Sequence, residues 1–233
     1  MNIAKQRVVI LGGTSGIGYA TAAAAVERGA EVVVVSRNAQ RVRDAADRLG
    51  ATGLAADLND LPGTLFAEIG DFDHLVYTAG EPLSLMPVAS FDLDRAREFF
   101  GLRYFGALAA VRAALPQLRP GGSITLTTGT AGDRPTPGWS VASSICGAVE
   151  SLTKALAVEL APIRVNAVKP GVTRSPLWGD GEGVEEFYAQ TAATVPLGRV
   201  AEVADVADAY LYLISQPFTT GTIVTVDGGA LLV

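Results

Sequence analysis

The chain has 233 residues, of which 49% are hydrophobic and 18% are charged, and this size and composition are typical of one globular domain with a substantial core. Its formal net charge of −6 leaves no excess of basic side chains for a phosphate backbone or an anionic lipid surface, so we expect neither a nucleic acid nor a membrane as a partner. One histidine and one cysteine, Cys146, exclude an internal disulfide, and we expect no metal site.

Short β-branched runs alternate along the chain with longer segments rich in alanine and leucine. The runs predict strands at 7–11, 31–35, 53–57, 74–78, 123–127, 163–168 and 222–226. The segments between them predict helices at 16–29, 39–49, 60–69, 90–118, 138–160 and 202–215. Such alternation indicates the α/β class, with a doubly wound parallel sheet and helices on both faces.

No linker, repeat or low-complexity tract divides the chain, so we expect one domain over residues 1–233. The stretch PGVTRSPLWGDGEG, which begins at Pro170, is rich in proline and glycine and predicts a functional flap near 170–195. The first apolar run, VVIL, is too short for a signal sequence, and no later segment approaches the roughly 20 residues that span a bilayer. We therefore expect a cytoplasmic protein.

A glycine-rich turn joins the first strand to the first helix and has the sequence GGTSGIG, from Gly12 to Gly18. Glycines allow a tight turn and a close approach of the backbone to a ligand, and the free N–H groups at a helix start attract a pyrophosphate. The turn therefore predicts a dinucleotide site, with the hydroxyls of Thr14 and Ser15 close by. The alternative is a turn whose glycines serve packing only.

The second strand ends in VVVVSRN, which places Ser36 and Arg37 where an NAD site carries an acid for the ribose 2′-hydroxyl. The acid is missing and a cation is present. Both differences favour a 2′-phosphate, and hence NADP(H) as the cofactor. The alternative is that Arg37 is an ordinary solvated surface charge.

Several motifs in order resemble those of the short-chain dehydrogenase/reductase family over essentially the whole chain: GxxxGxG, then AAD at 55–57, TAG at 78–80, IRVNAVKPG at 163–171 and VDGG at 226–229. The resemblance implies a Rossmann-type sheet of about seven strands, a nicotinamide dinucleotide across the carboxyl ends of the strands, and a homotetramer or homodimer. It implies further cofactor-binding roles for Gly12, Gly16, Ile17 and Gly18 at the pyrophosphate, Asp57 and Leu58 at the adenine, Ala79 and Gly80 at the ribose, and Pro170, Gly171, Val172 and Ser175 at the nicotinamide.

Two family patterns are altered. The family's NNAG is YTAG here, so Tyr77 and Thr78 replace two asparagines that brace the strands. The alignment also places Gly129, Ala142, Cys146 and Arg103 at the positions of the family's catalytic serine, tyrosine, lysine and asparagine. All four members of the catalytic tetrad are then replaced, and alanine has no proton to exchange with a carbonyl oxygen.

Three residues are candidates for a rebuilt site. Arg103 could act as an electrophile or could sit in a buried ion pair with a helix acid. Cys146 could titrate or could simply pack in the core. Thr128 could offer a hydroxyl only if its loop shifts.

Other polar and aromatic residues are less promising. Ser143 and Ser144 are expected to point away from the face of position 142, His74 to lie at the surface or at a strand end, and Trp139 to pack. The sequence thus predicts an atypical NADP(H)-dependent oxidoreductase with a rebuilt or weakened acid/base site. The alternatives are a non-catalytic NADP(H)-binding sensor and a purely structural oligomer.

Overall fold

The computed structural model describes residues 3–179 and 181–233. Seven strands form one sheet in the order β3-β2-β1-β4-β5-β6-β7, and every neighbouring pair is parallel. The strands are β1 Arg7–Leu11, β2 Glu31–Ser36, β3 Thr52–Ala55, β4 Phe72–Tyr77, β5 Leu118–Thr127, β6 Arg164–Pro170 and β7 Ile223–Val226. The predicted fold class, an α/β Rossmann-type domain with seven parallel strands, is confirmed.

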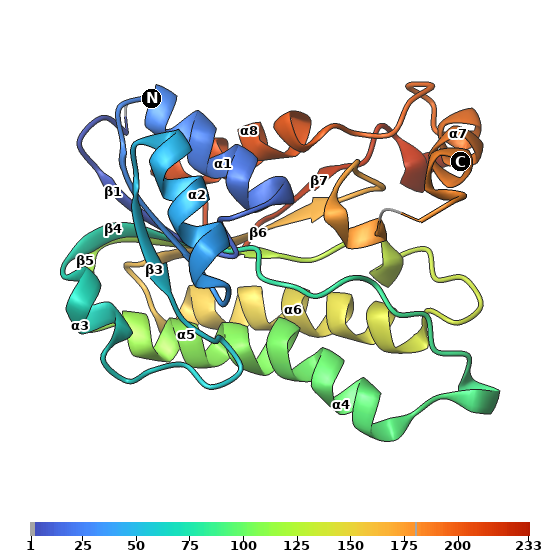
Figure 1. The fold of residues 1–233 in the computed structure, drawn as a ribbon, viewed down its shortest axis with the longest axis horizontal. Coiled ribbons are helices and arrows are strands. Elements are labelled where there is room, and N and C mark those ends of the chain that lie inside the picture. Colours follow the sequence, from blue (N-terminus) through green and yellow to red (C-terminus); the bar gives the residue numbers. More distant parts are fainter. Residues whose placement is uncertain (1–2, 180) are drawn as a thin grey trace.

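Helices cover both faces of the sheet (Figure 1). On one face lie α1 Gly16–Glu27, α2 Ala39–Leu49 and α8 Val203–Ser215; on the other lie α3 Leu65–Ile69, α4 Leu93–Phe100, α5 Ala107–Ala114 and α6 Ser140–Glu159. The side chains of each strand alternate between the two layers, so Val8 and Ile10 pack toward α1 and α8 while Val9 and Leu11 pack toward the opposite layer.

The long helix predicted over 90–118 is interrupted. It consists of α4, a π-helical segment at Gly101–Gly106, and α5, which ends two residues before Pro116. The hydroxyl of Tyr77 donates to the carbonyl of Leu102 at 2.6 Å, which gives the π-helical segment a partner from the sheet. A Cβ at Gly106 would lie 2.8 Å from the Tyr77 hydroxyl, so this approach requires glycine. Two glycines and one tyrosine therefore accompany the break that the helical periodicity did not predict.

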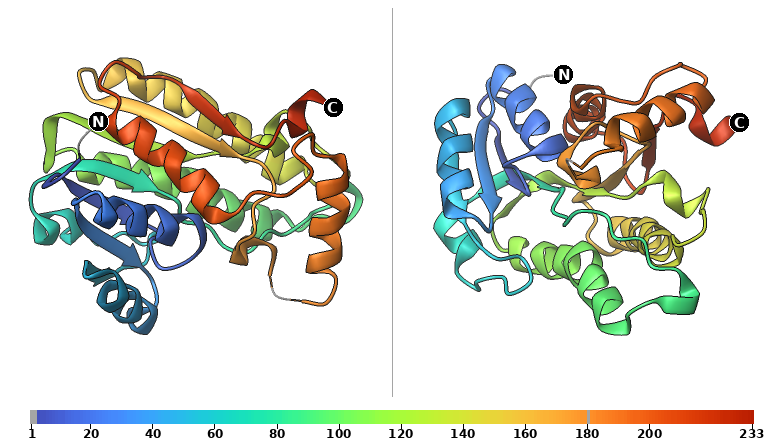
Figure 2. Two further views of the ribbon diagram at one scale, coloured as in Figure 1. Left: turned by 90° about the horizontal axis from the view of Figure 1, so that it is seen from above. Right: turned by 45° about the vertical axis from the view of Figure 1, so that its right-hand side comes forward.

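The predicted flap contains a short turn at Pro176–Trp178 and helix α7, Val184–Thr194, while its residue 180 lies outside the described residues. The sequence did not predict α7. Two acids in its first turn, Glu185 and Glu186, lie where the positive end of the helix dipole favours them. Figure 2 shows α7 beside the C-terminal residues at one end of the molecule, where Leu197 N–H donates to the Gly228 carbonyl at 3.2 Å.

Helix α6 corrects one expectation from the sequence. It has 20 residues with a mean hydropathy of 1.3 over its most apolar window, so by length and composition it could cross a membrane. One face of this helix, including Ile145, Val149 and Leu156, is buried against the other residues of the core. A core helix of a globular domain passes the same length test, so α6 carries little weight as a membrane span.

His74 is a second correction, because it lies inside β4 with an exposed fraction of 3% rather than at the surface or at a strand end. Its Nδ1 is 2.8 Å from Ser123 Oγ and its Nε2 is 3.0 Å from Gln6 Oε1, so both ring nitrogens have partners. Burial and the positive charge of Arg164 lower the pKa of His74 from 6.5 to about 4, although the negative charge of Asp73 acts to raise it. The neutral imidazole is thus part of the folded sheet.

The low pKa of His74 predicts an acid-dependent loss of stability. Between pH 6.5 and pH 4 the unfolded chain binds a proton at this residue and the folded chain does not, so the contribution of His74 to stability is complete above pH 6.5 and falls as the pH falls. Between pH 7 and pH 4.5 the free energy of unfolding of the wild type should fall by on the order of 2 kcal/mol more than that of His74→Gln. Urea unfolding of both proteins across this range measures the difference, and parallel pH profiles would contradict it.

Candidate active site

A cleft of about 950 Å³ runs along the edge of the sheet where the strands end. Residues that follow six of the seven strands, β1 to β6, contribute to its walls, as the topology requires of a doubly wound sheet. Every site residue predicted from the sequence lines it: Gly12, Thr14, Ser15, Gly16, Ile17, Gly18, Ser36, Arg37, Asp57, Leu58, Ala79, Gly80, Arg103, Thr128, Cys146, Pro170, Gly171, Val172 and Ser175.

The glycine turn has no room for side chains. A Cβ on Gly18 would lie 2.3 Å from the Gly12 carbonyl oxygen and 2.4 Å from Thr78 Oγ1, and Gly12 has a φ of 93° against the backbone of Ala79. Helix α1 begins at Gly16 with no side-chain cap from Ser15 and no acid in its first turn. Its first N–H groups are therefore available to an anion, which fits the pyrophosphate of a dinucleotide.

Threonine hydroxyls brace the ends of the central strands, one of them from Thr78 of the altered YTAG motif and the other from Thr127 of β5. Thr78 Oγ1 donates to the Leu11 carbonyl at 3.1 Å, and Thr127 Oγ1 donates to the Tyr77 carbonyl at 2.6 Å. Thr127 is also 2.5 Å from the hydroxyl of the buried Tyr210 on α8. The altered YTAG motif thus keeps its bracing through other side chains.

Two guanidinium groups stand at the end of the cleft beyond β2. Arg37 follows the strand, and Arg41 follows one turn later in α2, whose start is capped by Asn38 through a 2.9 Å bond to the Arg41 N–H. Both side chains are exposed, and among the described residues neither forms an ion pair. Arg41 was not predicted as a site residue, although it lies four residues after Arg37 in the first turn of the helix predicted at 39–49, where the two side chains can reach the same ligand.

The four residues that the alignment predicts at the family's tetrad positions lie in the cleft. Gly129, Ala142, Cys146 and Arg103 all line it, and a Cβ on Gly129 would lie 3.4 Å from Cys146 Sγ. Ser143 and Ser144 do not line it, in agreement with the prediction that they point away.

Cys146 is half-buried, and burial raises the pKa of its thiol. Thr128 Oγ1 donates to the Cys146 carbonyl at 3.1 Å and to Glu150 Oε1 at 3.3 Å, so its hydroxyl is engaged with α6. At neutral pH the thiol stays protonated, which argues against a thiolate base.

Arg103 forms an ion pair, but with Glu81 from the loop after β4 and not with an acid of its own helix. Its Nη2 donates to the Glu81 carbonyl oxygen, and its Nε lies 3.5 Å from Glu81 Oε2. The guanidinium also stacks over the Phe99 ring at 4.6 Å and lies close to Gly80, where a Cβ would be 2.7 Å from Arg103 Nη1. No local pattern predicts a role for Glu81, because its partner is 22 residues away and becomes a neighbour only where the loop after β4 passes beside the π-helical segment.

The polar atoms of this pair are incompletely satisfied. Among the described residues, neither Arg103 Nε nor Glu81 Oε2 has a hydrogen-bond partner, although both atoms are buried. Burial lowers the pKa of Arg103 and the charge of Glu81 opposes the change. Buried polar atoms of native proteins are usually paired, and these two atoms face each other across the ion pair at 3.5 Å without forming a hydrogen bond.

An ion-pair cluster around Lys169 links β6 to α6 and to the loop before it. Lys169, at the end of β6, has an exposed fraction of 6%, and its Nζ lies 2.5 Å from Asp133 Oδ2 and 2.9 Å from Glu150 Oε1. Burial acts to lower the pKa of Lys169, but the hydrogen bonds to the two carboxylates outweigh it and raise the pKa. Lys169 therefore stays charged and ties the loop before α6 to the sheet.

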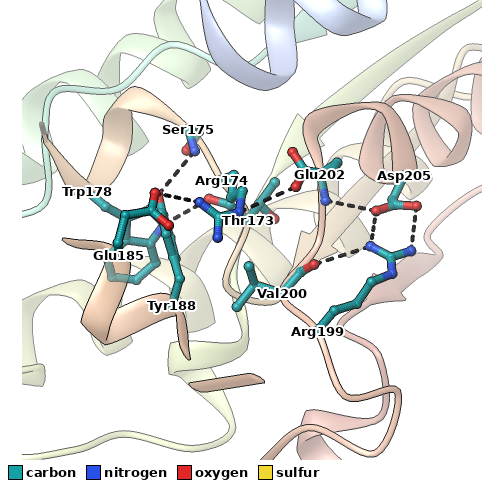
Figure 3. Close-up of polar contacts among 10 residues, drawn as sticks. All are labelled: Thr173, Arg174, Ser175, Trp178, Glu185, Tyr188, Arg199, Val200, Glu202 and Asp205. Atoms are coloured by element: carbon teal, nitrogen blue, oxygen red, sulfur yellow. Dashed lines mark hydrogen bonds and ion pairs between the residues drawn. The ribbon is translucent and has the colours of Figure 1, made fainter. Parts of the chain in front are cut away.

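The predicted flap is held by the residues drawn in Figure 3. Arg174 Nη1 lies 2.6 Å from Glu185 Oε1 of α7 and Arg174 Nε lies 3.4 Å from Glu202 Oε1, while the guanidinium covers the Tyr188 ring at 4.5 Å. The indole N–H of Trp178 donates to the Thr173 carbonyl at 3.0 Å. Trp178 lines the cleft, and so does Trp139, which was expected only to pack.

Comparison with known proteins identifies the family of the chain. A family model described as an SDR-like Rossmann domain matches residues 1–233. The structure of MalC Reductase/Diels-Alderase from Malbranchea aurantiaca superposes with a TM-score of 0.93 at 30% identity, covering 99% of this chain and 98% of that one. A small-chain dehydrogenase in complex with NADPH superposes with a TM-score of 0.87 at 36% identity, covering 98% of this chain and all of that one.

A third solved structure is an apo short-chain oxidoreductase from Pseudomonas aeruginosa PAO1 described as containing an atypical catalytic center. Its TM-score is 0.89 at 31% identity, and the match covers 98% of both chains. The family model matches residues 1–233, and the three solved structures superpose over 98–99% of this chain. The chain therefore belongs to the short-chain dehydrogenase/reductase family.

Proposed function

We propose that the chain is an NADP(H)-dependent oxidoreductase whose acid/base site has been rebuilt around Arg103. One observation carries the proposal: a single cleft contains both the glycine turn before α1 and the half-buried Arg103–Glu81 pair. The enzymes of the family to which it is similar are named dehydrogenases and reductases, which supports an oxidoreductase.

The residues of the cleft fit NADP(H). The N–H groups at the start of α1 would hold the pyrophosphate, and Arg37 and Arg41 would hold the 2′-phosphate, since no acid stands at the end of β2 to bind a free 2′-hydroxyl. When bound, the nicotinamide supplies or accepts the hydride. The NADPH complex of a small-chain dehydrogenase supports this cofactor.

The proposed rebuilt site follows from the four replaced positions. Ala142 offers no proton where the family has tyrosine, and the thiol of Cys146 offers no cation where the family has lysine. Arg103 is the cation at this end of the cleft, and a guanidinium aimed at developing negative charge stabilises it without itself losing a proton. The substrates proposed are therefore carbonyl compounds or activated alkenes, on whose oxygen negative charge develops during reduction.

One relative supports an altered centre in this family: the Pseudomonas aeruginosa oxidoreductase is described as containing an atypical catalytic center. The Malbranchea aurantiaca protein, described as a reductase and Diels-Alderase, supports a reductase. The second candidate function is a non-catalytic NADP(H)-binding sensor, which the replacement of all four positions favours. It differs from the first in predicting tight NADPH binding without turnover.

The two arginines beside β2 give a test of the cofactor. Arg37→Ala and Arg41→Ala should each weaken NADPH binding by roughly ten- to a hundredfold, because a hydrogen bond to a charged group contributes about 1.5–3 kcal/mol, while NADH binding should barely change. Calorimetric titration with both coenzymes measures this. Arg43→Ala, exposed on the same helix but outside the cleft, is the matched control. Equal losses for NADPH and NADH would show that these side chains do not bind the 2′-phosphate.

The second test concerns Arg103. With a panel of aldehydes, quinones and α,β-unsaturated carbonyl compounds, Arg103→Gln should lower kcat for NADPH oxidation by about 10²–10³-fold, the usual cost of losing an oxyanion donor, with NADPH affinity unchanged. Because this variant leaves the half-buried Glu81 without its partner, the double variant Arg103→Gln with Glu81→Gln serves as its control: it should regain stability in urea but not activity. Full turnover by the double variant would remove Arg103 from the mechanism. Tight NADPH binding by a wild type that reduces nothing in the panel would favour the sensor.

A further inference from the structure

The chain has two tryptophans, and both lie in the cleft although they come from different segments. Trp139 immediately precedes α6, and Trp178 closes the turn at Pro176–Trp178. Their ring centroids are 6.2 Å apart with planes tilted by 45°. Both side chains are only half-buried, so part of each indole faces the cleft.

Contacts with Thr173 and Phe187 hold the indole of Trp178 in its orientation. Its indole N–H donates to the Thr173 carbonyl at 3.0 Å, and the Phe187 ring of α7 packs against it with centroids 4.7 Å apart. Phe187 in turn contacts Tyr188 at 5.9 Å, the ring that Arg174 covers in Figure 3. The ion pairs of the flap thus hold one indole in place.

The loop after β4 joins the two tryptophan-bearing segments. The Leu83 N–H donates to the Leu177 carbonyl at 2.9 Å, next to Trp178, and the Met86 N–H donates to the Gly138 carbonyl at 2.8 Å, next to Trp139. These bonds fix the spacing of the two rings without filling the cleft. A preorganised surface of this kind loses little conformational entropy when a ligand binds.

The charge and polarity of this end of the cleft define the ligand further. Arg103 and Glu81 pair with each other, so the ionisable groups here add no net charge. Among the described residues the indole N–H of Trp139 has no hydrogen-bond partner, so it adds a free donor to an otherwise aromatic surface. A large aromatic face with few polar groups favours planar, neutral ligands that stack or meet it edge to face.

We infer that Trp139 and Trp178 form an aromatic subsite that selects substrates with a neutral, planar aromatic ring system attached to the reducible group. This inference rests on the proposed function, because it assigns the substrate class of the same cleft. The two rings contact each other, so the substrate ring lies against the surface they form and not between them. Its reducible group then points toward Arg103.

The experiment uses two amides that cannot be reduced by the enzyme, naphthalene-2-carboxamide and its fully saturated decalin counterpart. Binding of each to the full-length protein with NADP+ present is measured by calorimetry and by quenching of tryptophan emission, all of which comes from this subsite. The aromatic amide should bind roughly three- to tenfold more tightly even though the saturated one is more hydrophobic, since aromatic pairs gain energy beyond the area they bury. Equal or weaker binding of the aromatic amide, or no binding of either, overturns the inference.

Variants locate the effect. Trp178→Leu and Trp139→Leu should abolish the preference for the aromatic amide, Trp178→Phe should retain most of it, and Phe218→Leu, at a 98% exposed residue outside the cleft, is the matched control. A preference that survives both leucine variants overturns the inference.

The test separates the inference from the proposed function. Tight, tryptophan-dependent binding of the aromatic amide without reduction of 2-naphthaldehyde leaves the subsite standing and removes the reductase. Reduction of 2-naphthaldehyde and of decalin-2-carbaldehyde with the same KM leaves the reductase and removes the subsite.

Discussion

The close approach of the turn after β1 to the end of β4 is the constraint on which the rest of the site depends. Gly12 and Gly18 have no space for a Cβ, because the backbone of Ala79 and the hydroxyl of Thr78 fill it. This contact pulls α1 against the carboxyl ends of the two central strands and aims its free N–H groups into the cleft. β1 leads into the phosphate-binding turn, and β4 leads into the loop that carries Glu81. The contact between the ends of these two strands therefore also sets the position of Glu81 relative to the phosphate-binding turn.

The sequence was sufficient for the architecture and for the cofactor end of the site, and the physical reasons are local. Strand periodicity and parallel pairing follow from buried runs such as VVIL and VVVV, and the glycine turn is recognisable from the spacing of its own glycines. The resemblance to a known family then placed residues from six strand ends in one cleft. All of them line it.

The features that the sequence did not predict depend on contacts between distant segments. Glu81 meets Arg103 only because the loop after β4 passes beside the π-helical segment, and the two tryptophans meet only because the flap folds back over the start of α6. His74 looked like a strand-end residue because no local pattern announces that Gln6 and Ser123 will satisfy a buried imidazole. Long-range polar partners of this kind cannot be derived from periodicity.

The π-helical segment at Gly101–Gly106 sets the direction in which Arg103 points. A π turn holds about one residue more than an α turn, and each residue of an α-helix turns the next side chain by about 100°. Deleting one residue from this segment would give a more regular helix with better backbone geometry, yet the guanidinium would leave the cleft for another side of the helix. Chain length within a single turn, rather than residue type alone, is thus part of what specifies the chemistry of this enzyme fold.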